Sequence, residues 1–130
     1  CITTYRDGIV TTVIAIGAGG ALGSVLRYLI GRLVSGGVHA GFPIGTLAVN
    51  VVGCVLVGAL SRYFLGNEVH PVLKSALIIG FCGGFTTFSA FSLETVGLLS
   101  GGAAGKAFLY VVLSLVLCLA GTAAGFFAMR

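Results

Sequence analysis

The sequence predicts an all-α integral membrane protein that crosses the bilayer four times, and its composition and its hydropathy both point to this class. Charged residues make up 8% of the 130-residue chain, against roughly 25% in soluble domains. The mean hydropathy is +1.17. Apolar stretches fill the whole chain, which a signal peptide cleaved from the N-terminus would not explain. Because a spanning helix needs roughly 20 apolar residues, the chain has room for four.

Four spans are predicted at about residues 9–34, 43–64, 71–99 and 107–129, in a single membrane domain of residues 1–130. Short polar or glycine-rich segments connect them, and Pro43 and Pro71 each suit the first turn of a helix. In the first span, Gly19 and Gly23 form a G-x-x-x-G pair, a pattern that favours close helix packing. We expect no soluble domain within these residues.

The third predicted span contains a stretch, Gly80–Ser92, that is poorly suited to a lipid-facing helix. Gly83 and Gly84 each cost about 1 kcal/mol relative to alanine in a helix, and four hydroxyl side chains follow them. Irregular backbone at membrane depth survives only where protein buries it or where it lines a wet cavity. We therefore predict a broken third helix whose freed carbonyls and amides serve a polar site.

Directly after the glycines, an aromatic pair alternates with a hydroxyl pair. Phe88 and Phe91 are three residues apart and share a helix face, and Ser89 and Ser92 form a second such pair beside them. This pattern is unusual for a plain apolar core. It fits the wall of a narrow ion path.

Asn50, in the second span, is the other buried polar residue of interest, and two interpretations of it stay open. Its amide N–H groups can donate to an anion, or they can make an ordinary interhelical hydrogen bond worth about 0.6 kcal/mol. On the fourth span, Tyr110, Ser114, Cys118 and Thr122 recur every four residues on one slowly drifting face. That stripe fits a polar track for an ion, although ordinary helix packing explains it slightly better.

Charged residues within the spans are few. Arg27 either attracts anions at a pore mouth or bonds carbonyls near the interface, and Glu94 is a proton site or, more simply, a hydrogen-bond anchor. The three acids of the chain are dispersed and no phosphate-loop spacing is present, so we expect no enzyme. The net charge of +4 comes from scattered residues that form no patch, so we expect no nucleic-acid partner.

With these residues in hand, the chain resembles the Fluc (CrcB) family of fluoride channels over nearly its whole length. Three pieces carry the resemblance: Gly23-x-x-x-Arg27-Tyr28, Gly45-Thr46-Leu47-Ala48-Val49-Asn50-x-x-Gly53, and the Gly80–Ser92 stretch. The resemblance implies a fluoride-selective channel that exports fluoride passively and so lowers cytoplasmic fluoride. It further implies a multi-pass protein of the cell membrane, with fluoride, the lipid bilayer and a second copy in an antiparallel homodimer as its partners.

The resemblance also implies roles for individual residues. Gly83 and Thr86 would offer backbone carbonyls to a structural Na⁺ at the dimer centre, the one cofactor expected. Ala90 stands where the family usually has Thr, which removes one hydroxyl near the phenylalanines. The implied fluoride pathway comprises Arg27, Thr46, Asn50, Phe88, Ser89, Phe91, Ser92, Tyr110 and Ser114.

The balance of positive charge supports dual topology. Lys/Arg bias normally fixes the orientation of a membrane protein. Here the side with the termini carries four such residues and the other side three, namely Arg6, Arg62, Lys74 and Arg130 against Arg27, Arg32 and Lys106. The main alternative is a proton-coupled small dual-topology exporter, which would need a carboxylate in its first span. Residues 9–34 contain no Asp or Glu, which argues against that alternative.

Overall fold

The computed structural model describes residues 2–35 and 41–129, with side chains from residue 8 onward, and this part of the chain is helical apart from short connections. Four helical segments are long and apolar enough to cross a membrane: Gly8–Ser35, Ile44–Gly66, Pro71–Ser100 and Ala104–Ala128. The predicted all-helical class with four spans is therefore confirmed. The elements are α1 (Ile2–Ser35), α2 (Ile44–Gly66), α3 (Pro71–Ser75), the π-helical η1 (Ala76–Cys82), α4 (Gly83–Phe85), α5 (Phe88–Ser100) and α6 (Ala104–Ala128).

Two helices begin earlier than the predicted spans. The first starts at Ile2, well before residue 9, and the last at Ala104, before residue 107. Hydropathy marks only the apolar part of a helix, and polar residues such as Thr3 or Lys106 do not stop one. Pro71, by contrast, opens α3 as predicted, and His70 Nδ1 caps that helix by accepting from Val72 N at 3.3 Å.

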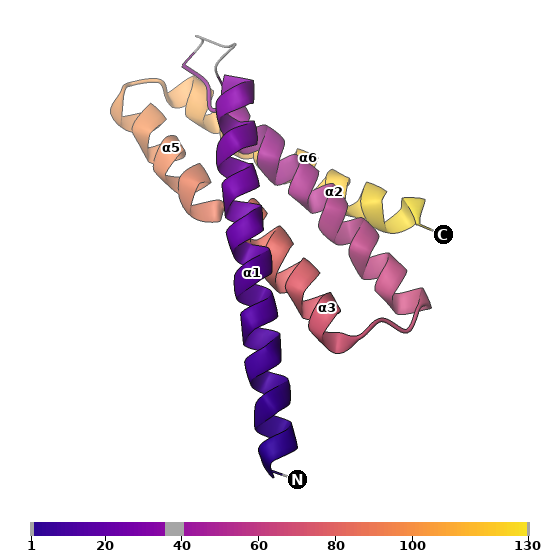
Figure 1. The fold of residues 1–130 in the computed structure, drawn as a ribbon. Coiled ribbons are helices and arrows are strands. Elements are labelled where there is room, and N and C mark those ends of the chain that lie inside the picture. Colours follow the sequence, from indigo (N-terminus) through magenta and orange to yellow (C-terminus); the bar gives the residue numbers. More distant parts are fainter. Residues whose placement is uncertain (1, 36–40, 130) are drawn as a thin grey trace.

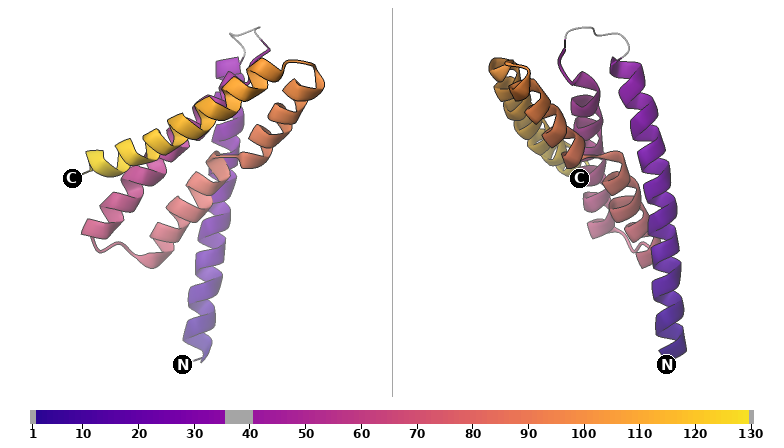
Figure 2. Two further views of the ribbon diagram at one scale, coloured as in Figure 1. Left: turned by 180° about the vertical axis from the view of Figure 1, so that it is seen from behind. Right: turned by 90° about the vertical axis from the view of Figure 1, so that its left-hand side faces the viewer.

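The helices associate as two closely packed pairs (Figures 1 and 2). α2 and α6 lie side by side, and α1 lies along η1 and α4 of the third span; these are the most extensive contacts of the described residues. The N-terminal end of α1 extends beyond the other helices (Figure 1). α5 leaves the line of α3 and forms a hairpin with α6 (Figure 2).

Glycines let α1 approach the third span at backbone distance. A Cβ atom on Gly19 or Gly23 would collide with the Ala76 or Phe81 carbonyl oxygen, and one on Gly84 with the Gly20 backbone. The predicted close packing of the Gly19/Gly23 pair is thus confirmed. A matching seam joins α2 to α6, where Gly58 and Gly125 each lie against backbone atoms of the facing helix.

Replacing Gly23 by alanine is expected to destabilise the protein by about 1–3 kcal/mol, because the new methyl group would overlap backbone atoms that cannot move aside. Gly17→Ala is the matched control on the same helix, since its Cβ would meet nothing within 4 Å. The control should be neutral or stabilising by up to about 1 kcal/mol through helix propensity. The midpoint of thermal unfolding in detergent measures both effects. Equal midpoints for the two variants would contradict the close packing of Gly23 against the third span.

Candidate functional site

Between α4 and α5 the backbone of the third span is extended at two residues. Thr86 has φ −84° and ψ 158°, and Thr87 has φ −151° and ψ 113°. Thr86 N still donates to Cys82 O at 3.0 Å, which closes the preceding turn. Thr87 is the N-cap of α5, where its Oγ1 accepts from Ala90 N at 3.2 Å. A threonine that caps the following helix explains why the chain leaves the helical path here.

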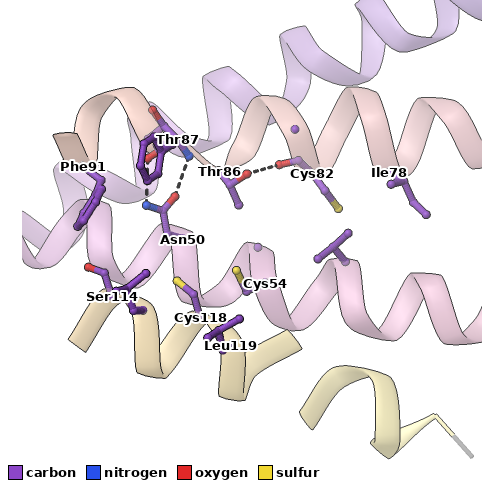
Figure 3. Close-up of a pocket in the computed structure, with 15 residues that line it drawn as sticks. Asn50, Cys54, Ile78, Cys82, Thr86, Thr87, Phe91, Ser114, Cys118 and Leu119 are labelled. Carbon is purple, nitrogen blue, oxygen red and sulfur yellow. Dashed lines mark hydrogen bonds between the residues drawn. The ribbon is translucent and has the colours of Figure 1, made fainter. Parts of the chain in front are cut away.

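Asn50 on α2 satisfies both backbone groups of Thr87. Its Oδ1 accepts from Thr87 N at 2.7 Å, and its Nδ2 donates to Thr87 O at 3.1 Å (Figure 3). Polar backbone groups at membrane depth need such partners. Since a side-chain amide has two N–H groups, one of them is left for a further acceptor. Both interpretations of Asn50, interhelical bond and donor to an anion, are therefore compatible with its geometry.

Two backbone carbonyls beside this point lose the donors that a continuous helix would give them. The N–H four residues after Gly83 is that of Thr87, which donates to Asn50 instead. The N–H four residues after Thr86 is that of Ala90, which donates to the Thr87 hydroxyl. Gly83 and Thr86 both line the cavity described next.

A cavity of about 420 Å³ lies between α2, the third span and α6. Among its lining residues are Asn50, Phe88, Phe91 and Ser114, and its wall is otherwise largely apolar. Ser114 is 7% exposed, and its Oγ has no hydrogen-bond partner among the described residues. Figure 3 shows its position on α6 opposite Phe91. A buried hydroxyl without a partner is costly, so this one is placed to serve a ligand or a water.

A series of neighbouring aromatic rings extends from this cavity. Phe88 and Phe91 have centroids 5.4 Å apart, and Phe91 and Tyr110 have centroids 5.2 Å apart. Phe42 meets Tyr110 edge-on at 5.6 Å. Aromatic rings carry a negative face and a positive edge, so a run of tilted rings can turn edges toward an anion. Phe88 is 76% exposed in the single chain, which leaves its ring open to a further partner.

Glu94 lies outside the described cavity lining, as do its partners Thr46 and Tyr110, and the sequence had offered it only as an anchor or a proton site. Its Oε1 accepts from Thr46 Oγ1 at 2.6 Å, and its Oε2 accepts from Tyr110 OH at 2.7 Å. The carboxylate thereby connects α5 to α2 and α6. The hydroxyls of Thr46 and Tyr110, both predicted for the ion path, are thus directed at Glu94.

The remaining predicted residues lie apart from the described cavity lining. Ser92 Oγ donates to Phe88 O at 2.9 Å, and Ser89 Oγ lies 3.1 Å from the Thr87 hydroxyl, so both make local bonds. Arg27 Nε donates across the α1 seam to Gly84 O at 3.2 Å. Of the two interpretations of Arg27, its geometry favours a bond to a carbonyl, although that carbonyl belongs to the third span rather than to a loop.

Comparison with known proteins places the chain in a family. The structure defines a class, a small four-span helical membrane protein with a partly polar cavity between its helices. The family described as CrcB-like protein, Camphor Resistance (CrcB), matches residues 14–126. The chain belongs to this CrcB family, as its motifs predicted, and it is a multi-pass membrane protein.

Relatives named "Fluoride-specific ion channel FluC" resemble the chain over most of their length. The protein of Geobacter sulfurreducens is 48% identical over 92% of this chain and 98% of its own. That of a Thermus thermophilus strain is 49% identical over 78% of this chain and 82% of its own. That of Flavobacterium psychrophilum is 46% identical over 88% of this chain and 93% of its own.

Proposed function

We propose that this protein is a fluoride-selective channel, a transporter rather than an enzyme, through which fluoride leaves the cell passively. The printed name of the relatives supports the ion, since all three bear it at 46% identity or more. The observation in this chain that carries the proposal is the Ser114 hydroxyl, which is buried, unpaired among the described residues and on the cavity wall.

Fluoride is small and strongly hydrated, so a path that strips its water must replace the lost hydrogen-bond donors. Ser114 Oγ–H and the second N–H of Asn50 are two such donors on the wall of one cavity. Phe88 and Phe91 add ring edges, which carry partial positive charge without binding the ion tightly. Weak, successive contacts of this kind let an ion enter and leave.

Efflux from liposomes containing the purified protein tests this function. Unmodified protein should pass fluoride and exclude chloride. Ser114→Ala should slow fluoride by about tenfold or more, the value of one hydrogen bond to a charged group. Phe88→Ile should also slow it, because the site stays apolar but loses the ring edge. Phe108→Ile is the matched control: this ring on α6 is 73% exposed and does not contribute to the described cavity lining.

Full-rate fluoride efflux by folded Ser114→Ala and Phe88→Ile proteins would contradict the proposed path. The competing exporter class makes the opposite prediction about driving force. A pH gradient alone should not concentrate fluoride in the liposomes, and proton-driven uptake would favour the exporter. The first span, Gly8–Ser35, contains no carboxylate to carry that proton.

The proposal extends to an antiparallel homodimer. Lys and Arg are nearly balanced between the two sides, which favours insertion in both orientations. In that count the Arg6 side chain and Arg130 lie outside the part that the structure describes. The exposed Phe88 ring gives the face around the cavity an apolar surface for a second copy to cover. Gly83 is exposed as well, and a Cβ there would meet only the Ile78 carbonyl oxygen at 4.0 Å, so packing within one chain does not explain this glycine.

A structural Na⁺ at the centre of such a dimer fits the residues present. The carbonyls of Gly83 and Thr86 have lost their helical donors, and hard oxygen ligands suit Na⁺ better than a transition metal. Two copies would supply four such oxygens. The ion would offset the negative ends of these carbonyl dipoles where the two copies meet, a structural role.

Labelling and sodium removal test the assembly separately from conduction. A single cysteine placed in the connection between α2 and α3 should react with an impermeant reagent from both sides of the membrane. Exhaustive replacement of Na⁺ by a large organic cation should weaken dimerisation, measured by light scattering in detergent. Labelling from one side only would exclude the antiparallel arrangement, and an unchanged dimer without sodium would exclude the structural ion.

A further inference from the structure

Two thiols from different helices lie near each other in the wall of the cavity. Cys54 on α2 and Cys118 on α6 both line it, and Figure 3 shows the two side chains on neighbouring helices at the same level of the cavity. The two thiols lie close enough to interact electrostatically. Both cysteines are free and partly exposed, whereas Cys82 on the opposite wall is buried. The pair is therefore accessible from the cavity.

The helices that carry these thiols are held firmly at this level. A Cβ on Gly121 would lie 3.7 Å from the Cβ of Cys54, and Gly125 on the next turn packs against the Val55 backbone. The glycine seam between α2 and α6 thus fixes the two backbones next to the thiols. Ligands mounted on rigid, packed helices need little rearrangement to bind together.

The number and type of ligands decide which metal ion the two thiols can bind. In residues 2–35 and 41–129, no group of three His, Cys, Asp or Glu side chains is placed to hold a metal ion. A zinc site needs more ligands than this pair offers. Two sulfur ligands suit a soft monovalent cation that accepts linear coordination. We propose that Cys54 and Cys118 form a binding site for such a cation, Ag⁺ or Cu⁺, and that its binding slows the passage of fluoride.

Charge balance explains the inhibition. Each thiol releases its proton, the cation bonds to both thiolates, and the resulting S–M–S unit carries one net negative charge. Asn50 and Ser114 lie one helical turn before Cys54 and Cys118, a rise of roughly 6 Å. A negative charge at that separation repels an anion from the donors of the path. The inhibitory half of the inference rests on the proposed function, and the binding half does not.

Titration of the full-length protein with silver nitrate in chloride-free buffer without added thiols tests the binding half. Cys1, outside the described residues, is first replaced by serine in every sample. Metal analysis after desalting should find a single Ag⁺ per chain. It should be lost in Cys54→Ala and in Cys118→Ala and retained in Cys82→Ala, the matched control. Ag⁺ should also protect both thiols of the otherwise unmodified protein from alkylation by maleimide, which requires no variant to fold.

Absence of bound Ag⁺, unprotected thiols, or loss of binding in Cys82→Ala would overturn the site. Ag⁺ should slow fluoride efflux by at least about tenfold, a Coulombic effect at this separation. Ag⁺ should not change the rate of fluoride efflux through the Cys118→Ala variant. Binding without slower efflux would overturn the inhibitory half. Metal-free protein that conducts no fluoride would contradict the proposed function alone, since Ag⁺ binding is measured independently of transport.

Discussion

Replacing Asn50 by alanine is expected to destabilise the protein by about 1–3 kcal/mol for each backbone group of Thr87 that it leaves unpaired. The substitution removes both hydrogen bonds, at 2.7 and 3.1 Å, that compensate for the extended backbone. Neither the N–H nor the C=O of Thr87 can form a helical hydrogen bond instead, because α5 begins immediately afterward with Thr87 as its cap. We also expect fluoride efflux to be lost, since a donor of the proposed path disappears together with the geometry of its wall.

Asn50→Asp separates these two effects. The carboxylate keeps an acceptor for Thr87 N–H, so part of the stability should return, but it has no N–H groups and adds negative charge, so efflux should stay absent. Asn67→Ala is the matched control at the end of α2, where Nδ2 bonds Tyr63 O at 2.9 Å on the exposed surface. Thermal midpoints in detergent and liposome efflux give the two readouts. Wild-type stability in Asn50→Ala would show that the amide does not support the third span.

The spans and the close-packing face of the first helix follow from the sequence because they depend on local properties. Hydropathy over a window of about 20 residues locates a spanning helix. The G-x-x-x-G spacing of Gly19 and Gly23 indicates the packing face whatever the partner helix is. The start of α1 at Ile2 was not predictable in the same way, because a helix that continues past the apolar region leaves no hydropathy signal.

Two extended residues lie inside the stretch where the broken helix is predicted, but the glycines that motivated that prediction are not the extended ones. Gly84 lies within α4, and packing against Gly20 on α1 accounts for it. The two extended residues are Thr86 and Thr87, held by an α2 side chain and by their own capping bonds. The π-helical turn Ala76–Cys82 leaves no pattern in the sequence either. Tertiary contacts decide these features, and helix propensity alone does not resolve them.

The candidate site was predictable as a set of residue types rather than as an arrangement. Asn50, Phe88, Phe91 and Ser114 meet around one cavity, while their roles in conduction stay predictions. The contacts of Glu94 span 48 and 16 positions of sequence, so no local spacing could reveal them. The available signal was that Glu94 is the only acid within a span, since a lone charge at that depth needs partners.

Glu94→Gln is expected to destabilise the protein by about 1.5–3 kcal/mol, the value of one hydrogen bond to a charged acceptor. The carboxylate accepts two hydroxyl protons at once, and Tyr110, one of the donors, is 0% exposed. A glutamine keeps one acceptor oxygen but turns an NH₂ group toward the other hydroxyl, which must then rotate and accept instead of donating. The hydrogen bonds that join α5 to α2 and α6 are thereby weakened.

A double-mutant cycle with Tyr110→Phe isolates this bond. Because both substitutions disrupt the same contact, their combined cost should fall short of the sum by about 0.5–3 kcal/mol. Thr95→Ala provides the matched control on α5, since among the described residues its hydroxyl bonds Phe91 O alone, at 2.7 Å. Its cost should add to that of Tyr110→Phe. Liposome efflux then decides between two roles for the tyrosine. If its hydroxyl stays on Glu94, Tyr110→Phe should slow fluoride less than Ser114→Ala does. Equal slowing would mean that the hydroxyl leaves the carboxylate and serves the ion.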